Sequence, residues 1–262
     1  MPPPWWVALG MPFQVESLEA GVEGRLHELF RGFEQATEPE FEARMFTIPE
    51  ESETEPHRLA HLLTNINLTA IQAAAGNLLL HAGAACRSDG RSVVLCGPSG
   101  SGKTTLTAEL VSGGLAYLTD ETVCIDPEQM RVTPFRKPLS LKPGAQALFP
   151  QLRPDEDEGG EAPGVWLVAP DDLGGVEVPK RPLLPALLVF PTHRPGASLQ
   201  VERIQEARAA YLLGKETSRL NAVRGGALHG LARLARRAPA YTVVHGGGGS
   251  ASRAVRELLD AA

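Results

Sequence analysis

The sequence predicts an α/β fold built on a mixed β-sheet with flanking helices, and three observations support this. An apolar strand at 92–96 leads into a glycine-rich loop at 97–102 and then into an amphipathic helix at 104–111. An Asp89-Gly90 pair separates that strand from the apolar segment before it, which is a hairpin signal. A turn at 126–129 predicts a second hairpin. Because hairpin strands are antiparallel, the sheet is expected to be mixed.

The composition is that of a globular protein without an extended apolar or basic region. The 262 residues are 43% hydrophobic and 21% charged, and the net charge of -6 argues against a general nucleic-acid binder. No run of about 18 apolar residues and no basic-then-apolar amino terminus occurs. We therefore expect a cytoplasmic protein with no nucleic-acid or membrane partner. Cys86, Cys96 and Cys124 are expected to be buried thiols.

Two regions are expected along the chain. Residues 1–55 form an N-terminal α/β extension packed on the core, with an amphipathic helix at 22–33. Residues 56–262 form the main domain, interrupted by a loop-rich insertion at 143–184 that contains the acidic run 155–158. Further elements of the main domain are predicted from periodicity and turn residues: a helix at 56–75, strands at 116–119, 186–190 and 241–244, and helices at 219–236 and 250–259.

The glycine-rich segment carries the strongest chemical signal. Residues 97–104 match the pattern G-x-x-x-x-G-K-[ST], with a strand before it and a helix after it. Such a P-loop, or Walker A motif, points backbone N–H groups and a helix amino terminus at phosphate oxygens. Lys103 would reach the β- and γ-phosphates, and Thr104 would ligate Mg²⁺. The residues expected to hold Mg²⁺-ATP are Gly97, Ser99, Gly100, Ser101, Gly102, Lys103, Thr104 and Thr105.

An acidic pair, Asp120-Glu121, follows the next predicted strand. One helix and one strand bring it back beside the loop, so one carboxylate could ligate Mg²⁺ while the other accepts a proton from an attacking hydroxyl. The alternative is an acidic turn at a strand end. If Asp89 and Gly90 are the two turn residues of the hairpin, His81 lies opposite Pro98 at the phosphate end. There His81 would hold Asp120 or contact a phosphate, unless it is only structural.

These residues resemble the catalytic domain of HPr kinase/phosphorylase and the shorter HPr-kinase-like proteins, some of which phosphorylate lasso peptides. The resemblance rests on residues 80–84, 97–104 and 118–121, and it extends over about 78–142. It implies a mixed-sheet P-loop domain similar to phosphoenolpyruvate carboxykinase. It also implies that Asp120 is the base, that Glu121 is a metal-site residue and that His81 is the partner of Asp120.

The chain departs from that family at two points. Glu121 stands where the family has Asp, and the glycine-rich signature and the regulatory domain of the bifunctional enzymes have no counterpart, which points away from HPr as substrate. Arg136 or Lys142 could contact a phosphate or an acidic substrate, or could simply lie at an exposed strand end. Four glycines at 246–249 could form a second phosphate site, but without a basic residue a flexible turn is favoured.

The sequence therefore predicts a Mg²⁺-ATP-dependent kinase that transfers the γ-phosphoryl group to a hydroxyl. The acceptor is expected to be serine of a peptide or protein, including a ribosomally made peptide natural product. The expected catalytic residues are Asp120, His81, Lys103 and Arg136. The alternatives are a kinase for a small molecule such as free serine, and a non-catalytic nucleotide-dependent switch or scaffold. Pyrophosphate as donor and a homo-oligomeric state stay open.

Overall fold

The chain forms two compact units. The computed structural model describes residues 4–16, 20–36, 43–47, 55–153, 164–218, 223 and 225–262. Unit 1 consists of Met1–Ala74 and Arg136–Leu173, and unit 2 consists of Ala75–Phe135 and Gly174–Ala262. The units thus differ from the division expected at residue 55: the helix that follows it groups with the amino terminus, and so does most of the expected insertion. The acidic run 155–158 lies outside the described residues.

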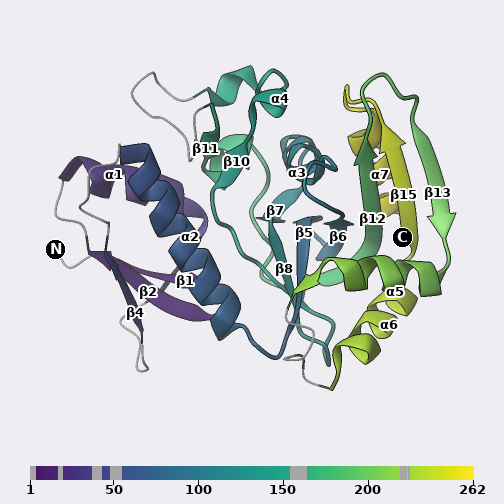
Figure 1. The fold of residues 1–262 in the computed structure, drawn as a ribbon, viewed down its shortest axis with the longest axis horizontal. Helices are drawn as coiled ribbons and strands as arrows, with labels where there is room; N and C mark the ends of the chain where they lie inside the picture. The colour runs from purple at the N-terminus through teal and green to yellow at the C-terminus, as the bar shows by residue number, and fades with distance from the viewer. Residues whose placement is uncertain are drawn as a thin grey trace. The chain divides into compact units, whose positions relative to one another are not determined.

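Unit 2 has an α/β architecture around a mixed sheet, as the sequence predicts (Figure 1). The sheet order is β13-β15-β12-β6-β5-β8-β9, and β7 and β14 also pair with β5. Strand β12 is parallel to β6 and β15, whereas β5 is antiparallel to β6, β7 and β8. The strands are β5 Leu78–Cys86, β6 Arg91–Cys96, β7 Ala116–Thr119, β8 Thr122–Ile125, β9 Val132–Thr133, β12 Leu184–His193, β13 Gln200–Ile204, β14 Thr217–Ser218 and β15 Ala240–His245.

The helices of unit 2 cover the two faces of this sheet. They are α3 Lys103–Ser112, α5 Glu206–Lys215, α6 Ala227–Arg237 and α7 Ser250–Ala261. Leu80, Ala82 and Ala84 of β5 share a core with α5 and α6, whereas Gly83 points to the opposite face, toward Thr107 of α3. The expected helix at 219–236 begins only at Ala227, after Gly226 with φ +89°. Among the described helices of the chain, none is long and apolar enough to cross a membrane.

The hairpin between β5 and β6 is antiparallel as predicted, but its register is shifted by one residue. Cys86 pairs with Ser92 and Ala82 pairs with Cys96, so the loop has three residues, 88–90, instead of two. Only Gly90 of the loop has a positive φ, +85°, so the expected two-residue type I′ turn is wrong. The last pair of this ladder is Ala82 with Cys96, and the His81 N–H donates to the Glu216 carbonyl at 2.7 Å, so the expected pairing of His81 with Pro98 is not formed. His81 still lies at the glycine-rich end of β6.

Unit 1 packs an aromatic core between a small sheet and its helices. The sheet order is β3-β1-β2-β4, with β1 Trp5–Ala8, β2 Met11–Glu16, β3 Glu34–Ala36 and β4 Arg44–Thr47. Phe13 lies 5.6 to 5.9 Å from the rings of Trp6, Phe30, Phe33 and Phe46. The predicted helices are confirmed as α1 Ala20–Leu29 and α2 Glu55–Ala73. The unit also contains η1 Phe30–Gly32, β10 Leu139–Leu141, α4 Pro143–Gln146, η2 Pro150–Leu152, β11 Trp166–Val168 and η3 Pro170–Leu173.

Candidate functional site

The glycine-rich loop, residues 97–102, connects β6 to the first turn of α3. Gly100 and Gly102 adopt φ values of +81° and +95°, which other residues rarely adopt. The Ser101 N–H donates to the Pro98 carbonyl at 3.2 Å, and the Leu106 N–H donates to the Gly102 carbonyl at 2.9 Å to begin α3. Pro98, Ser99 and Gly100 are exposed, whereas Gly97 and Ser101 are buried. A loop of this shape leads from a strand end directly into a helix amino terminus.

Lys103 joins this loop to β5. Its side chain is buried, and its ammonium group donates to the carbonyls of Gly97 and Pro98, at 3.0 Å for Pro98. The ammonium nitrogen also lies 3.2 Å from Nε2 of His81. The prediction that His81 lies at the loop end of the sheet is thus met by direct contact with Lys103, despite the register shift. Thr104 and Thr105 follow in the first turn of α3, both half-buried.

The acidic pair lies on the other side of β5, between β7 and β8. The Ala82 N–H donates to the Glu121 carbonyl at 3.0 Å, and Ala82 is paired on its opposite edge with Cys96. The backbone of Glu121 is therefore two strand spacings, about 10 Å, from the strand that leads into the loop. Asp120 is 5% exposed, and its Oδ1 accepts a hydrogen bond from the Tyr117 hydroxyl at 3.0 Å. Tyr117 thus helps to fix the carboxylate.

The buried cysteine beside the loop is a poor candidate for a nucleophile. Cys96 immediately precedes Gly97, and its burial strongly raises the pKa of its thiol, so the reactive thiolate is not populated near neutral pH. Burial likewise raises the pKa of Cys124, to about 12. All three cysteines are buried free thiols, as predicted.

Two histidines that sequence reasoning did not select flank the loop on the β12 side. His193 and His245 end the parallel strands β12 and β15 and are paired in register. The His193 N–H donates to the Ser101 carbonyl at 3.2 Å, and the two rings lie 5.3 Å apart. His245 directly follows the predicted strand at 241–244, and His193 lies three residues beyond the predicted strand at 186–190. Their proximity follows from strand pairing, which no local pattern encodes. A Cβ at Gly102 would lie 3.4 Å from both Cβ of His193 and Nε2 of His245.

His245 is the more enclosed of the two. It is 5% exposed, and within the described part of the chain neither ring nitrogen has a hydrogen-bond partner. Burial lowers the pKa of His245, and the neighbouring His193 lowers it further, because both disfavour the charged imidazolium. His245 is therefore a neutral imidazole near pH 7.

Arg136 and Lys142 are not among the residues that unit 2 brings together. Both belong to unit 1. There Arg136 donates to Oδ1 of Asp171 at 2.6 Å, and Lys142 is exposed just before α4. Their suggested contacts with a phosphate or an acidic substrate stay predictions.

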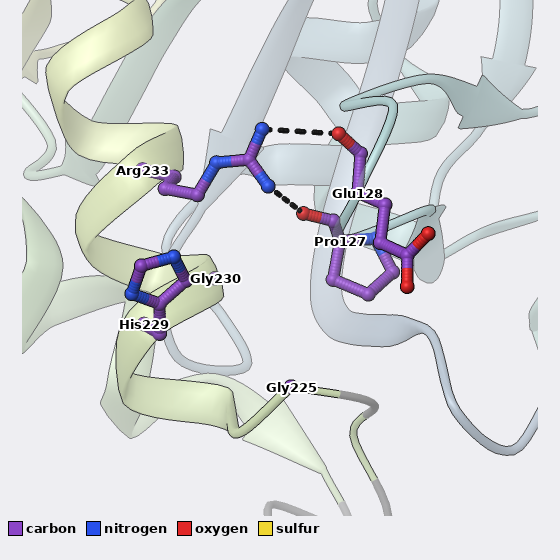
Figure 2. Close-up of a pocket in the computed structure, with 6 residues that line it drawn as sticks. All are labelled: Pro127, Glu128, Gly225, His229, Gly230 and Arg233. Carbon is purple, nitrogen blue, oxygen red and sulfur yellow. Dashed lines mark hydrogen bonds between the residues drawn. The ribbon is translucent and has the colours of Figure 1, made fainter.

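A separate pocket of about 350 Å³ lies between the 126–129 turn and α6. Figure 2 shows Arg233 reaching across it to donate to the carbonyls of Pro127 and Glu128, at 2.7 and 3.0 Å. His229 also lines it, with Gly225 and Gly230, and none of the predicted site residues does. Because two carbonyls already engage the guanidinium, Arg233 serves to hold the turn against the helix.

The residues predicted to bind Mg²⁺ fit its chemistry. Mg²⁺ prefers oxygen donors and usually takes one or two from the protein, with substrate phosphates and water supplying the rest. Thr104 offers a hydroxyl and Glu121 a carboxylate, both partly accessible. Across the described ranges, no group of three or more His, Cys, Asp or Glu side chains is placed to hold a metal ion. A bound Mg²⁺ would therefore need the substrate phosphates and water as further ligands.

The chain matches no protein-family model, and no curated protein matches it. Its function is therefore inferred from the residues themselves.

Proposed function

We propose that the chain is a Mg²⁺-ATP-dependent kinase that transfers the γ-phosphoryl group to a hydroxyl, with serine of a peptide or protein as the acceptor. The observation that carries this proposal is the contact of Lys103 with His81 at the end of the glycine-rich loop, with Asp120 and Glu121 across β5. A nucleotide site alone needs only the loop. A kinase also needs a base and a metal ligand at the reacting end.

Each residue has a distinct role in this proposal. The N–H groups of the loop and of the first turn of α3 bind the phosphates, and the Lys103 ammonium neutralises negative charge that develops during transfer. Thr104 and Glu121 would hold Mg²⁺, which when bound would supply positive charge to offset that of the phosphates. Asp120 accepts the proton of the acceptor hydroxyl, and Tyr117 orients its carboxylate.

Asp120 and His81 are already held in place by the fold before any substrate binds. Asp120 is buried at a junction between two strands, and His81, a residue of β5, donates its backbone N–H at 2.7 Å to the carbonyl of Glu216, the residue before β14. Groups that the sheet backbone already holds in place lose little conformational entropy when the substrate reacts, because that entropy was lost when the protein folded. The sequence motifs that contain these residues resemble those of HPr-kinase-like proteins, which supports the proposal.

Radiolabelled phosphoryl transfer tests the proposal. Protein is incubated with Mg²⁺ and γ-labelled ATP, together with free serine or serine-containing peptides, and labelled product is counted. We expect Asp120→Asn to reduce transfer by about 10²- to 10⁴-fold, which is the usual contribution of a general base. The matched control, Asp260→Asn, changes an exposed carboxylate at the end of α7.

Three results would count against the proposal in different ways. Equal transfer by wild type and Asp120→Asn would remove Asp120 as the base. Labelled free serine without labelled peptide would make the acceptor a small molecule. Nucleotide binding by the wild type with no labelled product from any acceptor would favour the switch or scaffold.

A further inference from the structure

The two sides of the glycine-rich loop differ in chemistry. On the β5 side lie Lys103, His81 and the acidic pair. On the β12 side lie His193 and, directly after β15, the glycine turn at 246–249. In the sheet order, β5 and β12 are the immediate neighbours of β6 on opposite edges. The loop that follows β6 therefore has charged side chains on its β5 side and histidine side chains on its β12 side.

We infer that His193 and the glycine turn at 246–249 form the subsite for the nucleoside of the nucleoside triphosphate. This inference rests on the proposed function, because it takes the reacting γ-phosphoryl group to lie on the Asp120 side. The nucleoside is at the opposite end of a linear triphosphate. It therefore leaves the loop on the β12 side, where ligands of α/β sheets meet the carboxyl ends of parallel strands.

The His193 ring is suited to stack on a base. It is solvent-exposed, yet its backbone is tied to the loop through the bond from its N–H to the Ser101 carbonyl. A Cβ at Gly247 would lie 3.8 Å from Nε2 of His193, so the ring extends from the loop to the glycine turn. The neutral, buried His245 ring lies behind it. Aromatic side chains are the usual partners of nucleobase faces.

The glycine turn provides an open surface beside this ring. Gly247, Gly248 and Gly249 all have positive φ, and a Cβ at Gly248 would meet nothing within 4 Å. The turn is nevertheless anchored, because a Cβ at Gly246 would meet the Ala197 carbonyl at 2.7 Å. A base can approach the backbone here without meeting side chains.

The same turn is not assigned to phosphate. Residues 246–249 include no lysine or arginine to balance the charge of an anion. The Ser252 hydroxyl at the start of α7 already donates to the Gly249 carbonyl at 3.0 Å. The turn is thus better suited to an uncharged ligand group.

Binding measurements with two probes test the inference. Calorimetric titrations with Mg²⁺-ATP and with Mg²⁺-tripolyphosphate are made on wild type, His193→Ala and His193→Phe. We expect His193→Ala to weaken ATP about 5- to 30-fold, the usual loss from removing one base-stacking side chain, and to leave tripolyphosphate unchanged. His193→Phe keeps an aromatic face and is expected to retain ATP affinity. His229→Ala, at the separate pocket, is the matched control.

The outcomes separate this inference from the function on which it rests. Unchanged ATP binding by His193→Ala, or an equal loss for both probes, overturns the nucleoside subsite while the triphosphate site stands. If the wild type binds neither Mg²⁺-ATP nor Mg²⁺-tripolyphosphate, both the nucleoside subsite and the proposed function are overturned. Failure of phosphoryl transfer alone leaves the result of these titrations fully interpretable, because they measure only binding.

Discussion

At the scale of single residues, the site depends on charged and polar side chains that the fold holds out of water. Lys103 and Asp120 are both 5% exposed, and buried charges need specific partners to persist. For Lys103 these include two loop carbonyls and His81, and for Asp120 they include the Tyr117 hydroxyl. The residue types and their order were predictable from the sequence. The Tyr117 contact was not, because it depends on the local path of the chain between β7 and β8.

His245 makes the stability of the protein depend on pH. Burial lowers the pKa of His245 below its ordinary value of 6.5. Just below pH 6.5 the imidazole is therefore protonated in the unfolded chain but still neutral in the folded chain. Stability is therefore full above about pH 6.5 and falls as the pH drops toward the folded-state pKa. We expect His245→Gln to flatten the decline in the free energy of unfolding between pH 7.5 and 5, measured by urea denaturation.

A matched variant controls for general charge effects. His229→Gln removes an exposed histidine and is expected to leave the pH dependence of the wild type unchanged. Groups common to both proteins, such as Glu109 with its raised pKa, cancel in the comparison. If His245→Gln shows the same decline as the wild type, His245 does not carry this pH dependence.

At the scale of elements, the hairpin and the loop helix could be predicted, and the exact register could not. The Asp89-Gly90 pair correctly indicated a hairpin, but a three-residue loop with only Gly90 left-handed satisfies the same sequence. Asp89 uses its side chain to accept from the Arg91 N–H at 3.1 Å, which favours that longer turn. His81 stays at the site because a one-residue shift moves it along the strand by only about 3.4 Å.

Close packing of α3 on β5 sets the position of the loop. A Cβ at Gly83 would clash with Oγ1 of Thr107, a fully buried side chain. We expect Gly83→Ala to lower the free energy of unfolding by about 1 to 3 kcal/mol through overpacking. Urea denaturation monitored by circular dichroism measures the change.

A second substitution tests the cause of that loss. Within the described residues, the Thr107 hydroxyl has no hydrogen-bond partner, so Thr107→Ala alone should have little effect on stability. In Gly83→Ala/Thr107→Ala the clash is relieved, and much of the lost stability should return. A double variant as unstable as Gly83→Ala would show that the loss has another origin.

At the scale of the whole molecule, the mixed α/β sheet was predictable because hairpin signals and strand patterns are local. The grouping into two units was not, since it depends on which distant segments pack together: residues 136–173 join the amino-terminal part. The same limit explains why His193 and His245 were missed. Both end strands far apart in sequence, and only the parallel pairing of β12 with β15 brings them to the loop.

Binding of Mg²⁺-ATP, measured by titration calorimetry, tests the central claim most directly: that the glycine-rich loop is a nucleoside triphosphate site. We expect saturable binding to the wild type and about 10- to 100-fold weaker binding to Lys103→Ala, as expected for loss of a hydrogen bond from a charged donor. Lys180→Ala, which changes an exposed lysine of the same unit, should bind as the wild type does. No binding to the wild type, or equal affinity in Lys103→Ala, would contradict the claim.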